Sequence, residues 1–419
     1  MLEKLVINGR KQLCGEVKIH GAKNAALPIL CACVLCDEKV VLKNCPKLSD
    51  IDNTIEILEY LGCKVTREED RVEILNSGYL KDNIPKNLMS KMRSSIVFLG
   101  ALTAKLGRAN LFLPGGCELG PRPVDIHIKS FEKLNVCIVE QRGKIACSTD
   151  KIKGASINLP FPSVGATENI MLLTALSDTK TLIHNAAREP EIIELQNFLN
   201  KCGADISGAG GNCIVINGVK KLHGCYHSIL PDRIEASTYM SFAAATGSTI
   251  SIKNICNEHI EPVVFAFREA GCEMNFVKNE LKISSPKKLN RIAHIKTLVY
   301  PGFPTDSGMP IIAMSAIANG TTIFEETIFQ NRYNAIGALN KMGANIKIYD
   351  RIAVVEGVEN LYGADVEATD LRGGAALVCA GLMAYGTTNI TQLHHIDRGY
   401  ENIEYNLSLL GADIKREKE

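Results

Sequence analysis

The chain repeats one pattern of apolar and polar positions six times. In each copy an amphipathic segment of helical period runs into a glycine or asparagine and then into a short apolar strand, as in IEILEYLGCKV and LQNFLNKCGADI. These two residue types best tolerate the left-handed backbone conformation that ends a helix. The spacing of 68 to 73 residues between markers predicts six copies of one folding unit. The markers are Gly62, Asn135, Gly203, Gly271, Gly343 and Gly411.

An apolar segment followed by a turn recurs with the same spacing. In each copy an apolar segment precedes a turn and another short strand, as in AALPILCACVL before DEKVVLKN. Segments that are apolar on nearly every face are typical of helices buried inside a layered domain. Each unit is therefore predicted to hold a buried helix, a strand, an outer amphipathic helix and a second strand. Six units favour an α/β fold of two domains with three units each, sheets around the buried helices, and one active site between the domains.

Charged residues recur at the predicted starts of the buried helices. Cations at a helix start oppose the helix dipole, so their repetition indicates anion binding rather than helix stabilisation. Arginines also recur before the outer helices, and a guanidinium fork suits phosphate or carboxylate, although any single arginine could lie on a solvated surface. The positions fourteen residues before each turn are Lys23, Arg93, Val164, Arg233, Asp306 and Arg372. The arginines before the outer helices are Arg122, Arg188, Arg332 and Arg398.

Two side chains could carry acid–base or covalent chemistry. Asp306, among the cations, could accept a proton from a hydroxyl group, and it could also cap its helix. Cys117, in GGCELGPRPVDIH, lies near Arg122 in sequence and could be a thiol with increased thiolate character, or a bystander. His127 could serve it as a base. Because His127 lies in a predicted helix beside Asp125, we interpret both residues as substrate-binding or structural.

Composition narrows the classes of partner. Lys and Arg number 47 and Asp and Glu 46, so the charge balance argues against a ring of repeats around nucleic acid, which needs a strongly basic inner surface. No apolar run reaches the length of a membrane span, and the N-terminal residues lack an uninterrupted apolar stretch, so we expect no signal peptide. The 15 cysteines then favour reduced thiols in the cytoplasm. The CACVLC stretch, with no histidine at ligand spacing, favours buried helix cysteines over a metal site.

Long motifs across nearly the whole chain resemble those of the bacterial UDP-N-acetylglucosamine 1-carboxyvinyltransferases. The resemblance implies two inside-out α/β barrels of three repeats, with residues 22–230 in the first domain and residues 1–21 and 231–419 in the second. It also implies transfer of the enolpyruvyl group of phosphoenolpyruvate to the 3′-hydroxyl of UDP-N-acetylglucosamine, with release of phosphate and no cofactor. This addition and elimination, through a tetrahedral intermediate, is the first committed step of peptidoglycan synthesis. The motifs are GAKNAALPIL, MRSSI, LPGGCELGPRPVDIH, PSVGATEN, AAREPEI, PDRIEA, YPGFPTD, ETIFQNR, DLRGGAALVCAGL and HIDRGYE.

The same resemblance implies a role for individual residues. Cys117 resembles the loop cysteine that donates a proton, forms a covalent adduct with phosphoenolpyruvate and is alkylated by fosfomycin. Asp306 resembles the carboxylate beside the sugar hydroxyl, and Lys23 and Arg398 complete the catalytic group. The implied phosphoenolpyruvate-binding residues are Lys23, Asn24, Arg122, Arg332, Arg372 and Arg398. The implied nucleotide-sugar contacts are Arg93, Arg122, Pro123, Val124, Asp125, Ile126, His127, Ser163, Val164, Gly165, Asp306 and Ile328.

Three stretches depart from the family pattern near these residues. SGMP follows PTD where a glutamine is usual, DLRGG replaces DLRAG, and QNRYNA replaces a more acidic, histidine-containing run. These changes concern the fine position of Asp306 rather than the class of reaction. A related enolpyruvyl transferase that acts on shikimate 3-phosphate shares the fold and the phosphoenolpyruvate site, but its loop lacks this cysteine.

Overall fold

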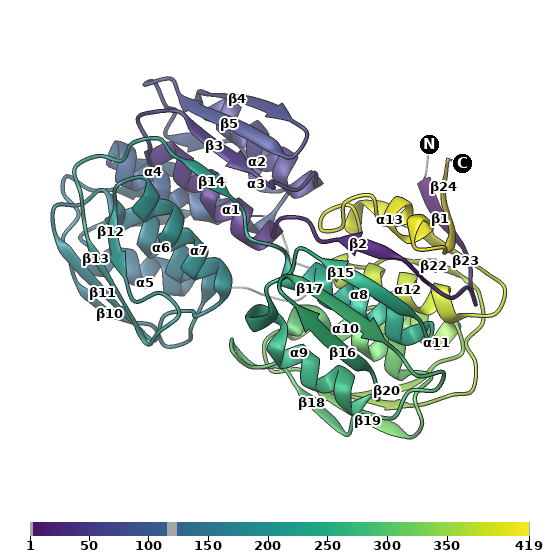
Figure 1. Ribbon diagram of the computed structural model, residues 1–419. Helices are drawn as coiled ribbons and strands as arrows, with labels where there is room; N and C mark the ends of the chain where they lie inside the picture. Colours follow the sequence, from purple (N-terminus) through teal and green to yellow (C-terminus); the bar gives the residue numbers. More distant parts are fainter. Residues whose placement is uncertain (1–2, 115–123, 419) are drawn as a thin grey trace. The chain divides into compact units, whose positions relative to one another are not determined.

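The structure is a computed structural model that describes residues 3–114 and 124–418 (Figure 1). The chain divides into two compact units. The central unit comprises residues 21–114 and 124–230, and the terminal unit comprises residues 3–20 and 231–418. Each unit has its own cluster of buried apolar side chains.

The central unit is built around three inner helices that are buried along most of their length, and the second of them contacts the other two. They are α1 (Lys23–Ala32), α4 (Phe98–Leu106) and α6 (Val164–Ala175). Its other helices are η1 (Cys33–Leu35), α2 (Ser49–Leu61), α3 (Lys86–Met89), η2 (Arg93–Val97), α5 (Asp125–Lys133) and α7 (Pro190–Lys201). Its strands are β3 (Val40–Lys43), β4 (Cys63–Glu68), β5 (Arg71–Asn76), β6 (Asn83–Ile84), β7 (Arg108–Phe112), β8 (Cys137–Gln141), β9 (Lys144–Ser148), β10 (Ser156–Asn158), β11 (Lys180–His184), β12 (Asp205–Ser207), β13 (Cys213–Asn217) and β14 (Tyr226–Ser228).

The terminal unit has the same plan. Its inner helices are α8 (Arg233–Ala245), α10 (Thr305–Ser315) and α12 (Leu371–Met383), and each contacts the other two. Its other helices are α9 (Asn257–Glu269), α11 (Ile336–Lys341), η3 (Leu393–His395) and α13 (Ile403–Leu409). Its strands are β1 (Glu3–Asn8), β2 (Glu16–Lys18), β15 (Thr249–Lys253), β16 (Glu273–Val277), β17 (Glu280–Ser284), β18 (His294–Lys296), β19 (Thr321–Glu325), β20 (Asn345–Tyr349), β21 (Ile352–Glu356), β22 (Asp365–Glu367), β23 (Thr387–Thr391) and β24 (Asp413–Lys418).

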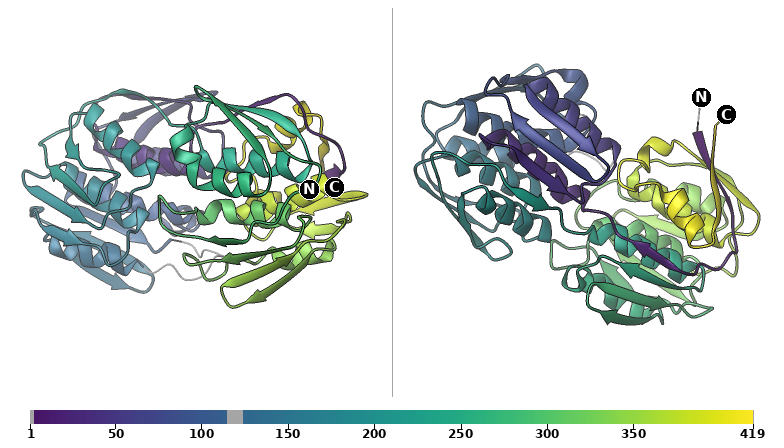
Figure 2. Two further views of the ribbon diagram at one scale, coloured as in Figure 1. Left: turned by 60° about the horizontal axis from the view of Figure 1, so that its bottom comes forward. Right: turned by 45° about the horizontal axis from the view of Figure 1, so that its top comes forward.

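The described residues form six four-stranded sheets with one shared pattern. In the order β10-β11-β13-β12, for example, the first pair is parallel and the next two pairs are antiparallel. The other five sheets are β14-β3-β5-β4, β6-β7-β9-β8, β2-β15-β17-β16, β18-β19-β21-β20 and β22-β23-β1-β24. Figure 2 shows helices between sheets within each unit. The predicted α/β fold of two three-unit domains is confirmed, and each sheet has two strands that the repeat pattern did not predict.

The residue that ends each predicted outer helix has the expected backbone. All six markers have positive φ, from 67° at Asn135 to 112° at Gly62. Because an α-helix requires negative φ, a residue in this region stops the helix and turns the chain toward the following strand. The regular spacing of these markers therefore reflects a helix-to-strand turn that recurs in every unit.

The charged positions of the repeat lie at the starts of the inner helices, as predicted. Lys23, Arg93 and Arg233 are the first residues of α1, η2 and α8, and η2 runs directly into α4. Asp306 and Arg372 are the second residues of α10 and α12. Each unit therefore places charged side chains beside the unpaired N–H groups of its inner helices.

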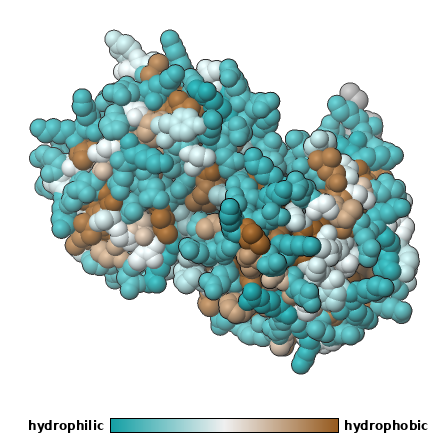
Figure 3. Space-filling view, viewed as in Figure 1, coloured by the Kyte–Doolittle hydropathy of each residue, from teal (hydrophilic) through white to brown (hydrophobic). Residues whose placement is uncertain are grey.

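Polar residues dominate the face shown in Figure 3, where apolar residues appear in scattered patches. In the described part of the chain, no helix has the length and apolar character needed to span a membrane. Cys31, Cys33 and Cys36 of the CACVLC stretch are buried, as predicted for helix cysteines. The described residues contain no cluster of three or more metal-ligating side chains placed to hold an ion.

Candidate active site

Asp306 lies between two buried arginines in the first turn of α10. Its Oδ1 accepts a hydrogen bond from Arg332 Nη2 at 2.7 Å, and its Oδ2 accepts one from Arg372 Nη2 at 3.1 Å. The arginine side chains are 2% and 4% exposed, whereas that of Asp306 is 26% exposed. Two guanidinium charges favour an ionised carboxylate that still reaches solvent. The alternative role as a helix cap is wrong, because Pro304 is the N-cap and no side chain caps this helix.

Arg372 connects α12 to two other segments of the terminal unit. Its Nη1 donates to the Tyr400 hydroxyl at 3.0 Å, and that hydroxyl lies 3.0 Å from Thr238 Oγ1 on α8. Burial by itself would lower the pKa of Arg372, but Tyr400, Asp306 and Asp232 together raise it above the ordinary value. Among the described residues, its Nε is a buried donor without a hydrogen-bond partner. Arg372 is therefore a fixed positive charge with one unused donor.

Glu326 holds the first turn of α10 and the segment after β19 together. Its Oε2 accepts from the Thr305 hydroxyl at 2.7 Å, and its Oε1 accepts from the backbone N–H of Ile328 at 2.7 Å. Arg332 donates to the Thr305 carbonyl through Nε at 3.1 Å and Nη2 at 2.7 Å. Because Glu326 is buried, these bonds fix Ile328, a predicted nucleotide-sugar contact, relative to Asp306.

Two of the family departures are accommodated by packing in this unit. Ser307 is buried, and its hydroxyl lies 2.7 Å from that of Ser237 on α8. At Gly373, a Cβ atom would lie 2.7 Å from Asp370 Oδ2 and 2.8 Å from Ala335 Cβ. Gly373 therefore fits a tight contact that alanine could not enter without a shift. Gln330 and Asn331 of the third departure are exposed.

Arg398 lies between η3 and α13 and is half-buried. Burial, His394 and the positive charge of Arg398 each lower the pKa of His395. Arg188, in contrast, binds the side-chain amide of Asn212 in the central unit. The arginines before the outer helices thus have different surroundings.

Lys23 begins α1 of the central unit and forms a buried ion pair. Its Nζ lies 2.9 Å from Asp50 Oδ2, and the two side chains are 10% and 3% exposed. Asn24, the next residue of the helix, is half-buried. The Asp50 carboxylate therefore anchors the lysine that, by the family resemblance, is expected to bind phosphoenolpyruvate.

His127 has a defined tautomer. Asn169 Oδ1 accepts from the Gly100 N–H at 2.8 Å, so the amide nitrogen of Asn169 faces His127 Nδ1 at 2.9 Å. An amide nitrogen only donates, so Nδ1 accepts and the ring proton lies on Nε2. Burial, together with the charge of Arg93, lowers the pKa of His127 to about 4. The neutral His127 ring therefore presents Nε2–H as a hydrogen-bond donor. A donor at this position cannot accept a proton, so the geometry disfavours His127 as a base and favours it as a contact to a ligand.

The start of α6 lies against this ring. A Cβ atom at Gly165 would be 3.4 Å from His127 Cε1, and Ser163 caps the helix by accepting from the Ala166 N–H at 3.3 Å. Val164 begins the helix and is half-buried. The geometry thus brings His127 and the Ser163–Gly165 turn together.

The remaining predicted contacts of this unit lie at the start of α5. Val124 is the N-cap and Asp125 the first residue, exposed and 3.7 Å from Lys129 in an ion pair. Ile126 is half-buried. The predictions for Cys117, Arg122 and Pro123 fall outside the described residues.

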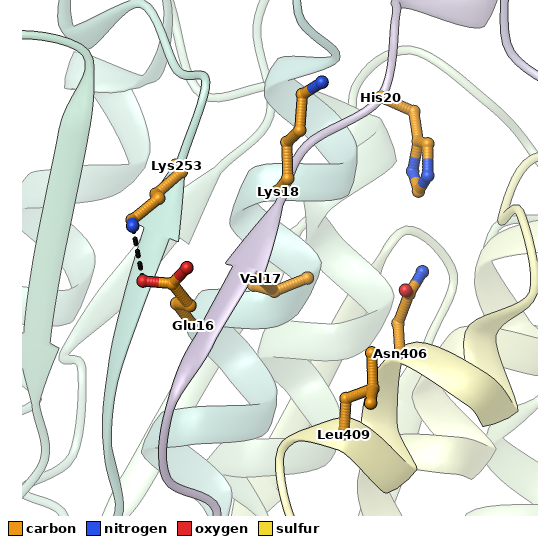
Figure 4. A pocket seen from close by; sticks show the side chains of 7 residues that line it. All are labelled: Glu16, Val17, Lys18, His20, Lys253, Asn406 and Leu409. Atoms are coloured by element: carbon orange, nitrogen blue, oxygen red, sulfur yellow. Dashed lines mark ion pairs between the residues drawn. The ribbon is translucent and has the colours of Figure 1, made fainter. Parts of the chain in front are cut away.

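Two hollows of the structure involve few of these groups. One, of about 260 Å³, lies in the terminal unit and has walls from β2, β15 and α13 (Figure 4). Its lining comprises Glu16, Val17, Lys18, His20, Lys253, Asn406 and Leu409, and Lys253 pairs with Glu16. The other, of about 440 Å³, lies in the central unit and is lined in part by Ile126. Apart from Ile126, neither lining contains a predicted site residue, so hollow volume alone does not locate the proposed chemistry.

His20, on the rim of the first hollow, is tied to a buried carboxylate. Its Nδ1 lies 2.8 Å from Glu235 Oε1, and its backbone N–H donates to Oε2 at 2.8 Å. Burial would lower the pKa of His20, but Glu235 raises it to about 9. Burial also raises the pKa of Glu235. The geometry and the His20 shift both favour a protonated imidazole on an ionised carboxylate.

Sequence reasoning missed the residues that position the predicted ones. Tyr400, Glu326, Asp50 and Asn169 support Arg372, Ile328, Lys23 and His127 respectively. Tyr400 and Glu326 stand within the motifs HIDRGYE and ETIFQNR, which provided a signal that could have found them. Asn169 likewise ends the motif PSVGATEN, whereas Asp50 lies outside every quoted motif and needs the tertiary structure.

Comparison with known proteins places the chain in a class. The family model of EPSP synthase (3-phosphoshikimate 1-carboxyvinyltransferase) matches residues 7–407. The crystal structure of the enolpyruvyl transferase NikO from Streptomyces tendae superposes with a TM-score of 0.90 at 22% identity and covers 99% of both chains. An EPSP synthase from Acinetobacter baumannii gives a TM-score of 0.75 at 17% identity over 100% of both chains. The fold is therefore that of the enolpyruvyl transferases.

Curated relatives narrow the class to one family. The chain is 50% identical to UDP-N-acetylglucosamine 1-carboxyvinyltransferase 2 of Caldanaerobacter subterraneus and 47% identical to that of Carboxydothermus hydrogenoformans, with 99% of every chain covered. It is 44% identical to UDP-N-acetylglucosamine 1-carboxyvinyltransferase 1 of Staphylococcus aureus, again with 99% of both chains covered. The chain belongs to the family of UDP-N-acetylglucosamine 1-carboxyvinyltransferases, which confirms the resemblance in its motifs.

Proposed function

We propose that this chain is a transferase that moves the enolpyruvyl group of phosphoenolpyruvate to the 3′-hydroxyl of UDP-N-acetylglucosamine and releases phosphate, the first committed step of peptidoglycan synthesis. The placement of Asp306 between Arg332 and Arg372 carries this proposal. Relatives that are 44–50% identical to the chain are named UDP-N-acetylglucosamine 1-carboxyvinyltransferases, which supports it. The reaction needs fixed positive charge for a phosphorylated acid and a base for a hydroxyl proton, and this cluster holds both.

In the proposed mechanism, Asp306 takes the proton of the sugar hydroxyl as its oxygen bonds to C2 of phosphoenolpyruvate. Cys117 donates a proton to C3, which gives a tetrahedral intermediate. C3 then loses a proton, the double bond re-forms, and the bond from C2 to the phosphate oxygen breaks. No cofactor takes part in these steps.

The arginines of the terminal unit supply charge for the phosphate and carboxylate groups. Arg332, Arg372 and Arg398 fill this role in the proposal, and buried cations are worth more in electrostatic stabilisation than exposed ones. The unused Nε donor of Arg372 supports it, because a buried N–H without a partner favours an anion that can accept from it. Lys23, Asn24 and Arg122 are the proposed donors to phosphoenolpyruvate from the other part of the chain.

The nucleotide sugar is proposed to contact the start of α6, the start of α5 and the segment held by Glu326. The Nε2–H of His127 is a neutral donor for a carbonyl or phosphate oxygen of this substrate. The full proposed set is Arg93, Arg122, Pro123, Val124, Asp125, Ile126, His127, Ser163, Val164, Gly165, Asp306 and Ile328. We place the reaction in the cytoplasm, in agreement with the free thiols of the described cysteines.

Phosphate release with two acceptors tests the proposal. The purified protein with phosphoenolpyruvate is expected to release phosphate when UDP-N-acetylglucosamine is added, with a product whose mass is that of the enolpyruvyl ether. Shikimate 3-phosphate in its place is expected to give none. Release with shikimate 3-phosphate alone would assign the chain to the other acceptor.

Cys117 has its own test. We expect Cys117→Ala to lose nearly all turnover, and fosfomycin to leave one covalent adduct on Cys117 of the wild type. Mass spectrometry of the intact protein and its peptides reads out the adduct. The exposed Cys137 provides the control, since Cys137→Ala should keep both turnover and adduct. An adduct on Cys137, or none, would contradict the role of the loop cysteine.

A further inference from the structure

A cluster of two thiols lies in the central unit, where Cys202 Sγ and Cys225 Sγ are 3.3 Å apart. The buried Cys36 thiol raises the pKa of Cys202. Cys202 follows the last residue of α7, and Cys225 directly precedes β14. Nothing in the proposed transfer reaction uses this cluster, which lies among residues of one compact unit.

The backbone on both sides of the Cys202–Cys225 contact is held by regular hydrogen bonds. The Cys202 N–H donates to the Phe198 carbonyl at 3.1 Å, and the Cys202 carbonyl accepts from the His223 N–H at 2.9 Å. The Cys225 carbonyl accepts from the Val41 N–H at 2.9 Å. Two fixed segments, rather than a loose loop, therefore bring the sulfurs together.

We propose that Cys202 and Cys225 form a redox-active dithiol that closes to a disulfide when a peroxide oxidant is present. A disulfide bond is about 2 Å long, so from 3.3 Å closure requires a movement of about 1.3 Å. Transient disulfides of this kind are the form in which cytosolic proteins respond to oxidants. The bond would join the end of α7 to the residue that precedes β14 and enclose the β12–β13 hairpin.

The oxidation is balanced with hydrogen peroxide as the only co-reactant. Cys225 reacts first, because it is half-buried whereas Cys202 is fully buried. The Cys225 sulfur attacks one peroxide oxygen, the O–O bond breaks, and one water leaves as a sulfenic acid forms. The Cys202 sulfur then attacks the Cys225 sulfur, the S–S bond forms, and the S–O bond breaks with loss of a second water. Two thiols lose two electrons and one peroxide becomes two waters.

The surroundings of the pair make closure slow. The hydrogen bond with Cys225 lowers the pKa of Cys202, but Cys36 and burial outweigh it and raise that pKa well above the ordinary value. The contact with Cys202 and burial raise the pKa of Cys225, while Lys201 opposes both shifts. Because the thiolate is the reactive form, we expect the disulfide to accumulate only under sustained oxidant.

Peptide mapping of the oxidised full-length protein tests the proposal. After incubation with hydrogen peroxide, free thiols are alkylated in denaturant and the protein is cleaved with trypsin. The expected product joins peptide 202–220 to peptide 222–233, lacks two hydrogen atoms relative to the separate peptides, and disappears on reduction. Alkylation of both Cys202 and Cys225 after oxidation would overturn the proposal, as would a bond from Cys202 to Cys36.

A matched variant resolves the one ambiguity in this map. Peptide 202–220 also contains Cys213, a half-buried thiol of the same unit whose Sγ lies 3.8 Å from the Ile214 carbonyl oxygen. In Cys213→Ser the cross-linked peptide is expected at the wild-type level, and in Cys202→Ser it is expected to be lost. Loss of the cross-link in Cys213→Ser would assign the reactive thiol to Cys213 instead. If either variant fails to fold, fragmentation of the wild-type cross-linked peptide shows whether Cys202 or Cys213 carries the alkyl group, and an alkylated Cys202 would overturn the proposal.

Discussion

Replacing Asp306 by asparagine removes one negative charge and one proton acceptor but keeps the shape of the side chain. Loss of a general base costs about 10²–10⁴-fold in turnover, or about 3–5 kcal/mol in the barrier. The stability cost comes from Arg332 and Arg372, whose nearly buried charges then share one neutral amide. Breaking a buried ion pair costs about 3–5 kcal/mol. Asp306 is 26% exposed, and the amide oxygen of asparagine still accepts one hydrogen bond. We therefore expect Asp306→Asn to lower the free energy of unfolding by about 1–3 kcal/mol.

Two measurements on Asp306→Asn separate these effects. Phosphate release with phosphoenolpyruvate and UDP-N-acetylglucosamine gives the turnover, and urea unfolding gives the free energy of unfolding. Glu404→Gln is the matched control, because Glu404 Oε1 accepts from Arg416 Nε at 2.9 Å and is 20% exposed. It should lose at most about 1 kcal/mol of stability and no turnover. Turnover of Asp306→Asn within about threefold of the wild type would refute the role of base.

Two further predictions concern histidines. Asn169→Leu removes the hydrogen-bond donor to His127 Nδ1. We expect it to raise KM for UDP-N-acetylglucosamine about tenfold and to leave kcat and KM for phosphoenolpyruvate unchanged. A tenfold loss in kcat would instead indicate general misfolding and contradict a role in binding the nucleotide sugar. The second is His20→Gln. Glu235 raises the His20 pKa from 6.5 to about 9, so the pair contributes at most about 3 kcal/mol to the free energy of unfolding. This contribution is fully present below pH 6.5 and is lost as the pH rises through about 9. Urea unfolding of both proteins across this range should show the difference shrinking with pH, and a constant difference would disprove the charge pairing.

The repeated architecture could be predicted because its signals are local. A residue such as Asn135 ends a helix through its own backbone conformation, and an all-apolar stretch is buried whatever surrounds it. The short edge strands gave no such signal. β14 has three residues and pairs in parallel with β3, which lies far away in sequence. A three-residue strand is too short for an alternating pattern, so only the tertiary structure reveals it.

The charged residues of the candidate site could be predicted from the sequence, but the residues that hydrogen-bond to them could not. Arg372 and Lys23 stand out because their positions recur at helix starts. Their hydrogen-bond partners, Tyr400 and Asp50, depend on how separate segments pack, which residue spacing does not encode. Asp306 shows the same limit, since its residue type suits a helix cap while its position after Pro304 directs it to the arginines.

The sheet that joins both ends of the described chain constrains synthesis on the ribosome. β1 pairs with β24, so Glu3 meets Lys418 and Asn8 meets Asp413. The central unit can fold as soon as its own residues emerge, but the first strand waits for nearly the entire chain to be translated before its sheet is complete. Throughout that interval its apolar face and unpaired backbone groups are open to other nascent chains. This strand is where we expect chaperones to be needed most.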